Sequence, residues 1–308
     1  MKLATFVADA RSALGVVDTV RGEILDLARA GQGLPAFSSM LALIDAGPEG
    51  LAQARRLADA WPREAVVPLA GTRLLAPLPE PRQFRDGMFF EEHVRNAGRR
   101  VAEAQGLPPP PVPAIWYERP IYYLTSRFAV GGPDTVVTWP SYSKVMDFEL
   151  ELACVLGRSG RDIPAASAME HVFGYTIFND LSARDTQGRE MQGRLGPSKG
   201  KNFDGSNVLG PWIVTADEIG DPYALAMEAR VNGERWGGGS SGSMHHKWAD
   251  VIAFISSSET LHAGEIIGSG TVGTGCGLEL NRFLKDGDVV ELDIERIGVL
   301  RTTVVTAA

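Results

Sequence analysis

Two glutamates lie close together in an otherwise apolar segment, residues 145–157, of sequence VMDFELELACVLG. The alternation of bulky apolar side chains with smaller or charged ones predicts a β-strand, in which side chains two residues apart point the same way. Glu149 and Glu151 would then lie on one face, roughly 7 Å apart. No lysine or arginine lies within the segment, so a buried pair of glutamates needs a counter-charge from elsewhere. A divalent cation, which prefers oxygen ligands, would supply one.

The alternative for this pair is a solvated sheet face, and the chain contains an example of that pattern. In residues 289–297 (VVELDIERI), three acids alternate with apolar residues, which is typical of a strand with one face in water. The segment 145–157 differs because its charged face continues into Ala153 and Val155. On spacing alone, the metal site and the solvated face both remain open.

A third carboxylate is found in residues 174–187, GYTIFNDLSARDTQ, where a predicted strand runs into Asp180. We expect a helical turn there, which would place Asp180, Arg184 and Gln187 on one helix face. An acid, a cation and an amide at the end of a strand suit the binding of an anionic ligand. The alternative is a capping aspartate with solvent-facing Arg184 and Gln187.

The elements that must position these side chains fall into two parts. Residues 1–72 predict a small α/β unit, with strands joined at VRGEI (20–24) and then two helices, one capped by Ser38 or Ser39 and one opening at Pro48. The proline-rich stretch 74–84 predicts a boundary. Beyond it, the sequence predicts a helix at 89–105, a stiff proline loop at 107–113 and a mobile Gly/Ser-rich loop at 236–248. Strands are expected at 145–157, 174–179, 208–215, 225–232, 265–272 and 288–305.

Composition excludes several classes of protein. Of the 308 residues, 44% are hydrophobic and 22% charged, which predicts a packed core rather than disorder. The net charge of −8 without a basic block makes nucleic acid and anionic membrane poor partners. The sequence has no long apolar run and no signal-peptide pattern, and its two cysteines, Cys154 and Cys276, indicate no disulfide framework. We therefore expect a soluble, cytoplasmic protein.

Four segments, in this order, resemble the fumarylacetoacetate hydrolase family: DFELELACVLG (147–157), GYTIFNDLSARDTQ (174–187), GKNFDGSNVLGPWIVT (200–215) and GEIIGSGTVGTG (264–275). The resemblance covers roughly residues 74–305. It implies an α+β, mainly β fold, a mixed β-sandwich roll at residues 73–308, with the small N-terminal α/β domain at 1–72. It also implies a divalent metal, Mg²⁺ or Mn²⁺, with Ca²⁺ as a further possibility.

The resemblance also implies roles for particular residues. It assigns metal binding to Glu149, Glu151 and Asp180, and to Asp86, which lies seven residues before His93. It makes His93 the general base. Some relatives carry a glutamate where Asn96 stands here, so Glu279 is the expected orienting partner of His93.

Further residues are assigned to the substrate by the same resemblance. Lys201 would stabilise developing oxyanion or enolate charge, with neighbouring Lys199 facing solvent. Arg184 and Gln187 would contact the substrate or hold the pocket, and Thr271 would bind a substrate carboxylate. The aromatic stretch 117–123 (YERPIYY) is expected to shape specificity.

The implied activity is hydrolysis of a C–C bond in a 2-oxo or 1,3-dicarbonyl acid, of the acylpyruvate or fumarylacetoacetate type, through a metal-bound enolate, as in aromatic catabolism. The same enolate serves the alternative, an isomerase or decarboxylase of a 2-oxo dicarboxylic acid, of the 2-hydroxyhepta-2,4-diene-1,7-dioate isomerase or oxaloacetate decarboxylase type. Asn96 favours this alternative unless Glu279 substitutes. A lesser alternative is a non-catalytic, metal-stabilised binding module. Expected partners are a small-molecule 2-oxo acid and a second copy of the chain, in a homodimer.

Two further signals are set aside. The segment GSGTVG (268–273) matches a dinucleotide-binding pattern, but a quick return to a strand is expected after it rather than a long helix. His245 and His246 are adjacent, which is poor geometry for metal binding from one strand face, and we expect them in a surface loop or a lid.

Overall fold

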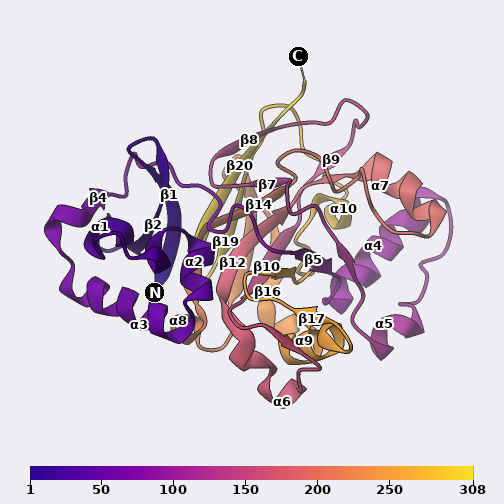
Figure 1. Cartoon of the computed structure of the whole chain (residues 1–308). Helices are drawn as coiled ribbons and strands as arrows, with labels where there is room; N and C mark the ends of the chain where they lie inside the picture. Colours follow the sequence, from indigo (N-terminus) through magenta and orange to yellow (C-terminus); the bar gives the residue numbers. More distant parts are fainter. Residues whose placement is uncertain (308) are drawn as a thin grey trace.

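The computed structural model describes residues 1–307 as two large sheets that share a core, with helices and two small two-stranded sheets around them (Figure 1). This is the α+β, mainly β sandwich architecture that the sequence predicts. The larger sheet has eleven strands, of which ten follow the order β4-β3-β2-β1-β14-β12-β10-β18-β5-β6, with β7 beside β14. The smaller sheet has the order β16-β15-β19-β20-β8.

The N-terminal part supplies one end of the larger sheet. Strand β3 begins directly after Gly22, in the turn that the sequence predicts. Helix α2 begins after Ser39, whose hydroxyl accepts a hydrogen bond from Ala42 N–H at 3.0 Å. The elements are β1 (Lys2–Ala8), β2 (Arg11–Asp18), β3 (Glu23–Asp26), α1 (Leu27–Ala30), η1 (Pro35–Phe37), α2 (Met40–Asp45), α3 (Gly47–Ala60), η2 (Arg63–Ala65) and β4 (Val66–Pro68).

The centre of the larger sheet is buried on both faces. Every residue of β10 and β14 is buried, which explains why these strands read as nearly continuous apolar runs. The strands are β5 (Phe84–Gly87), β6 (Tyr122–Leu124), β7 (Val130–Gly131), β10 (Leu150–Leu156), β12 (Val172–Asp180), β14 (Asn207–Thr215) and β18 (Ile266–Gly268).

The smaller sheet packs its apolar face on the same core. Along β19, Val290, Leu292 and Ile294 are buried while Glu291 and Asp293 are half-exposed, so the solvated face expected for this segment is confirmed. The strands are β8 (Thr135–Thr138), β15 (Ala226–Val231), β16 (Glu234–Ser240), β19 (Val289–Ile294) and β20 (Gly298–Val305).

Helices and short strands complete the structure, with α4, α5 and α7 grouped at one end of the molecule (Figure 1). Among residues 1–307, no helix has the length and apolar character that a bilayer span needs. The remaining elements are α4 (Glu91–Ala104), α5 (Ala114–Glu118), β9 (Met146–Asp147), β11 (Gly160–Arg161), α6 (Ala165–Ala168), η3 (Met169–His171), β13 (Ser182–Ala183), α7 (Arg184–Glu190), η4 (Met191–Gly193), α8 (Ala216–Ile219), η5 (Ser241–Ser243), α9 (Trp248–Ser256), β17 (Thr260–Leu261) and α10 (Gly277–Leu280).

Three expectations are wrong in detail. The Gly/Ser-rich loop begins as strand β16, because Gly237–Gly239 pair with β15 through their backbones. Asp180 ends strand β12 and does not start a helix; the helix begins at Arg184. The strand expected at 145–157 is interrupted at Phe148 and Glu149, where Glu149 instead makes an isolated bridge to Cys276.

The first 72 residues form one end of the larger sheet, and their buried side chains belong to clusters that also contain residues of the later strands. Strand β1 pairs with β14 through Lys2 and Leu3, opposite Val214 and Ile213. Leu3 is fully buried in a cluster that also contains residues of α2 and β14. The boundary at 72/73 stays a prediction, since the strand pairing crosses it.

Replacing Leu3 by alanine tests this junction. We expect the free energy of unfolding to fall by about 2–5 kcal/mol, because the substitution leaves a cavity in the cluster that Leu3 shares with residues of α2 and β14. Urea denaturation measures it, with Val20→Ala in the exposed turn as the control, for which a change within about 0.5 kcal/mol is expected. Equal effects of the two substitutions would show that the junction is not packed as described.

Candidate active site

Three buried carboxylates converge from neighbouring strands of the larger sheet. Asp86 lies on β5, Glu151 on β10 and Asp180 at the end of β12, and β10 is adjacent to β12 while β18 separates β10 from β5. One oxygen of each lies within 4.8 Å of the others, and none of the three residues is more than 3% exposed. The sheet therefore gathers acids that are far apart in the sequence.

A glycine on β18 makes room for this approach. Gly268 pairs with Asp86 on one side and Ala153 on the other. A Cβ at Gly268 would lie 2.6 Å from Asp86 Oδ1 and 2.8 Å from Glu151 Oε2. Any larger residue at this position would push the two carboxylates away. Sequence reasoning did not single out Gly268, because its role depends on the register of two neighbouring strands.

Each of the three carboxylates has one oxygen that lacks a hydrogen-bond partner within residues 1–307: Asp86 Oδ1, Glu151 Oε1 and Asp180 Oδ1. Two of the other oxygens accept hydrogen bonds: Gly270 N–H donates to Glu151 Oε2 at 2.8 Å, and Tyr123 Oη donates to Asp180 Oδ2 at 3.3 Å. Burial is the largest cause and raises the pKa of all three; the charge of Glu149 also raises it, while the charge of Lys201 opposes the shift at Asp86 and Asp180. Unpaired buried oxygens in this number fit a divalent cation with oxygen ligands.

Glu149, also expected to bind metal, has both oxygens engaged by cations in this structure. Arg184 Nη2 donates to Oε1 at 2.7 Å and Lys201 Nζ donates to Oε2 at 2.6 Å. Burial alone would raise the pKa of Glu149, but these two charges outweigh burial and lower it.

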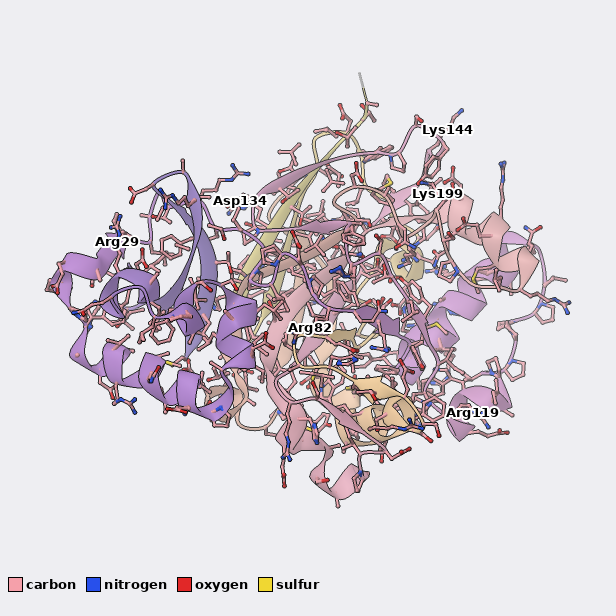
Figure 2. All side chains as sticks on the ribbon, in the orientation of Figure 1. Arg29, Arg82, Arg119, Asp134, Lys144 and Lys199 are labelled. Carbon is pink, nitrogen blue, oxygen red and sulfur yellow. The ribbon has the colours of Figure 1, made fainter. Side chains whose placement is uncertain are left out.

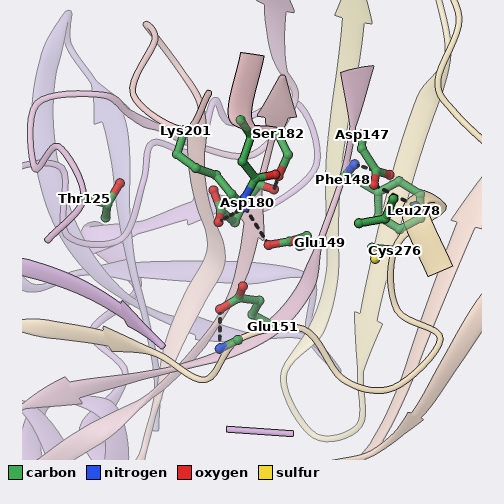
Figure 3. A network of polar contacts seen from close by, with 12 residues as sticks. Thr125, Asp147, Phe148, Glu149, Glu151, Asp180, Ser182, Lys201, Cys276 and Leu278 are labelled. Atoms are coloured by element: carbon green, nitrogen blue, oxygen red, sulfur yellow. Dashed lines mark hydrogen bonds and ion pairs between the residues drawn. The ribbon is translucent and has the colours of Figure 1, made fainter. Parts of the chain in front are cut away.

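Lys201 connects Glu149 to the cluster of three carboxylates. It is 2% exposed, and its Nζ also contacts Asp180 Oδ2 (Figure 3). Burial tends to lower the pKa of Lys201, but the charges of Asp180 and Glu149 raise it above the usual range. Lys199, in contrast, lies exposed at the surface (Figure 2). The lysine with a place in the cluster is therefore Lys201.

Arg184 connects the cluster to the short helix α10. Its Nε donates to Asp147 Oδ2 at 2.8 Å and its Nη1 to Gln187 Oε1 at 2.9 Å. Asp147 in turn accepts hydrogen bonds from the N–H groups of Gly277 and Leu278, at 2.7 and 2.8 Å, at the start of α10. Asp147 was not among the expected site residues. Its position two residues before Glu149, on the same strand face, is the signal that would have found it.

Helix α10 presents Glu279 to His93 of α4. His93 Nδ1 lies 2.8 Å from Glu279 Oε1. Glu279 Oε2 accepts hydrogen bonds from Asn96 Nδ2 at 2.8 Å and from Thr274 N–H at 2.9 Å. Asn96 therefore holds the glutamate in place. Burial alone would raise the pKa of Glu279, but the hydrogen bond and charge of His93 outweigh it and the pKa is lowered.

The carboxylate cluster and the histidine–glutamate pair are neighbours. The bridge between Glu149 and Cys276 places the cluster beside the residue that precedes α10, and Cys276 Sγ lies 4.0 Å from His93 Nδ1. Thr271, in the loop after β18, is 1% exposed, and its hydroxyl has no partner within the described chain. The structure thus brings the carboxylate cluster and Lys201 close to the pair of His93 and Glu279. Arg184 and Gln187 are hydrogen-bonded to each other.

The balance of buried charges fits a site for a cation. Two positive side chains, Lys201 and Arg184, face five buried carboxylates, so three negative charges lack a counterpart in the described chain if all are ionised. A divalent ion would balance two of them. The five acids are Asp86, Asp147, Glu149, Glu151 and Asp180.

The family model described as fumarylacetoacetate (FAA) hydrolase, C-terminal, matches residues 83–305. The human protein named oxaloacetate tautomerase FAHD2A, mitochondrial, is 36% identical over 299 residues, which cover 95% of this chain and 87% of that one. The oxaloacetate tautomerase YisK of Bacillus subtilis is 32% identical over 314 residues, with 97% and 98% covered.

Solved structures agree over the whole chain. A fumarylacetoacetate hydrolase from Exiguobacterium antarcticum superposes with a TM-score of 0.79 at 29% identity, covering 100% of both chains. The maleylpyruvate hydrolase of Sphingobium sp. SYK-6, in complex with manganese(II) and pyruvate, gives a TM-score of 0.77 at 26% identity, again covering 100% of both.

Replacing Gly268 by alanine tests the carboxylate cluster without removing any carboxylate. We expect the protein to fold, because the atoms nearest to the new methyl group are the ends of the Asp86 and Glu151 side chains, which can move. Affinity for Mn²⁺, measured by calorimetry, should fall at least about tenfold, as when the supports of a metal site are disturbed. Gly188→Ala, where a Cβ meets nothing within 4 Å, is the matched control. Unchanged Mn²⁺ affinity in Gly268→Ala would contradict the arrangement described.

Proposed function

The chain belongs to the fumarylacetoacetate hydrolase family, and we propose that it is a divalent-metal-dependent enzyme that interconverts the keto and enol forms of a 2-oxo dicarboxylic acid such as oxaloacetate. The observation that carries the proposal is the set of three unpaired carboxylate oxygens next to a hydrogen-bonded histidine–glutamate pair. The names of the relatives favour tautomerisation over the hydrolysis expected first from the sequence.

Asp86, Glu151 and Asp180 would hold the metal through their unpaired oxygens. The ion, Mg²⁺ or Mn²⁺, supplies a Lewis acid that neutralises negative charge on the oxygens of a 2-oxo acid. Glu149, in the arrangement seen here, orients Lys201 and Arg184. Thr271, with its buried and unpaired hydroxyl, would receive a substrate carboxylate. Tyr123, which reaches Asp180, is the residue of the aromatic stretch that lies closest to this chemistry.

The reaction moves one proton between C3 and the oxygen on C2, so it needs one group that both accepts and returns a proton. Because Glu279 engages Nδ1 of His93, the other ring nitrogen, Nε2, is left to take the proton from C3. Glu279 then stabilises the imidazolium, and Asn96 keeps Glu279 in position. The ammonium of Lys201 adds a positive charge for the oxygen on which negative charge develops.

Hydrolysis of a C–C bond in a 1,3-dicarbonyl acid is the second candidate. The structural likeness to a maleylpyruvate hydrolase supports it, and so does the pair itself, since His93 oriented by Glu279 is equally suited to deprotonate a water molecule. In tautomerisation His93 takes a proton from C3 of the substrate, whereas in hydrolysis it takes a proton from water. Parallel assays with oxaloacetate and with acylpyruvates therefore separate the two candidates. The homodimer expected from the sequence stays a prediction.

Replacing Glu279 by glutamine tests the proton-transfer pair. We expect kcat for oxaloacetate tautomerisation to fall by about 10²-fold or more, because glutamine cannot stabilise the imidazolium form of His93. The rate is measured by the ultraviolet absorbance of the enol. Glu103→Gln, at an exposed position of the same helix as His93, should retain wild-type activity. Undiminished turnover of both oxaloacetate and acylpyruvates in Glu279→Gln would remove Glu279 from the mechanism.

Removal of the metal tests catalysis against a purely structural role. With a chelator, we expect turnover to vanish while the circular dichroism of the folded protein remains, because two large apolar cores hold the fold. The melting temperature should fall, as mass action removes a ligand that binds only the folded state. Addition of Mg²⁺ or Mn²⁺ should restore activity. Unfolding of the chelated protein at 25 °C would support the metal-stabilised binding module instead.

A further inference from the structure

A buried thiol completes a second group of metal-ligating atoms, distinct from the carboxylate cluster. Cys276 is fully buried and directly precedes α10. Its Sγ lies 3.5 Å from Glu279 Oε1 and 4.0 Å from His93 Nδ1. Cys276 is not in a disulfide. The cluster of Asp86, Glu151 and Asp180 offers only oxygen, whereas this group offers one sulfur, one nitrogen and one oxygen.

The separations are close to those of a tetrahedral zinc site. Bonds of about 2.3 Å to sulfur and about 2.0–2.2 Å to nitrogen and oxygen require ligand atoms roughly 3.4–3.6 Å apart. The sulfur–oxygen separation of 3.5 Å already fits. The sulfur–nitrogen separation of 4.0 Å must shorten and the nitrogen–oxygen separation of 2.8 Å must lengthen, each by about half an ångström. Rotation of the three side chains is enough for shifts of this size.

We propose that His93, Cys276 and Glu279 form a second metal site, which takes Zn²⁺ and chemically similar ions and, when filled, switches off the proton-transfer pair. Thiolate and imidazole select such ions, whereas Mg²⁺ and Ca²⁺ prefer the all-oxygen cluster. The two sites therefore discriminate between metals by ligand type. Three protein ligands leave the fourth tetrahedral position for water.

Zinc inhibits because it changes which ring nitrogen of His93 carries the proton. In the metal-free pair, neutral His93 carries its proton on Nδ1, because Glu279 accepts there. Binding of Zn²⁺ releases the Cys276 thiol proton to solvent and uses the lone pair of His93 Nδ1, so the ring proton moves to Nε2. Nε2 can then no longer accept a proton from the substrate. The inhibition rests on the proposed function, whereas the metal binding does not.

Cobalt(II) is the probe for binding, because a thiolate ligand gives Co²⁺ a charge-transfer absorption in the near ultraviolet that oxygen ligands do not. The full chain, saturated with Mg²⁺, is titrated with Co²⁺ and then with Zn²⁺. We expect the thiolate absorption to saturate at one Co²⁺ per chain and to disappear as Zn²⁺ displaces Co²⁺. Absence of the absorption in the wild-type protein would overturn the site.

Matched variants identify the thiol. Cys276→Ser should lack the absorption and Cys154→Ala, which removes the other buried thiol, should keep it. Circular dichroism shows whether each variant is folded, and Cys276→Ala replaces Cys276→Ser if serine prevents folding. Persistence of the absorption without Cys276, or its loss without Cys154, would overturn the assignment.

Activity tests the switch separately. With Mg²⁺ in excess, Zn²⁺ should inhibit wild-type oxaloacetate tautomerisation, and the inhibition constant of Cys276→Ser, relative to its own zinc-free rate, should rise at least about tenfold. If the absorption appears but Zn²⁺ leaves turnover of oxaloacetate and acylpyruvates unchanged, the site stands and the switch is overturned. If the protein turns over neither substrate, the proposed function fails while the cobalt result still decides the site.

Discussion

Mutual repulsion among buried carboxylates is the constraint on which this site depends. Asp86, Glu151 and Asp180 come together in the interior, where burial and the charge of Glu149 both raise their pKa values. Two cations compensate part of the negative charge of the buried carboxylates. Lys201 contacts Glu149 and Asp180, and Arg184 contacts Glu149 and Asp147. A fold that keeps three acids together with one oxygen of each unpaired is arranged for a cation, since leaving those oxygens unpaired costs free energy.

The same charged groups connect the cluster to the pair of His93 and Glu279. Arg184 contacts both Glu149 and Asp147, and Asp147 caps the start of α10, which carries Glu279. One network of charged groups thus holds both the carboxylates and the helix that carries Glu279.

The sequence predicted most of what depends on local pattern. Alternation identified the segments of β10 and β19, strands were also expected where β12 and β14 lie, and the caps and prolines identified α2 and α3. The pairing of His93 with Glu279 came from resemblance, because the two residues are 186 positions apart. Gly268 was missed because its importance lies in contacts between strands that no local pattern records. Cys276 was missed because the residue it approaches, His93, is 183 positions away in the sequence. Asp180 was placed on a helix because the polar residues after it resemble a helix start, whereas β14 pairs with β12 as far as Asp180 itself.

The location of bound manganese tests the central claim most directly. A crystal of the protein grown with Mn²⁺ and measured at a wavelength with manganese anomalous signal shows where the ion lies. The account predicts one peak within about 2.0–2.6 Å of an oxygen from each of Asp86, Glu151 and Asp180, the range that hard cations adopt with oxygen ligands. A fully occupied peak elsewhere, or carboxylates that stay in place with no ion between them at saturating Mn²⁺, would contradict it.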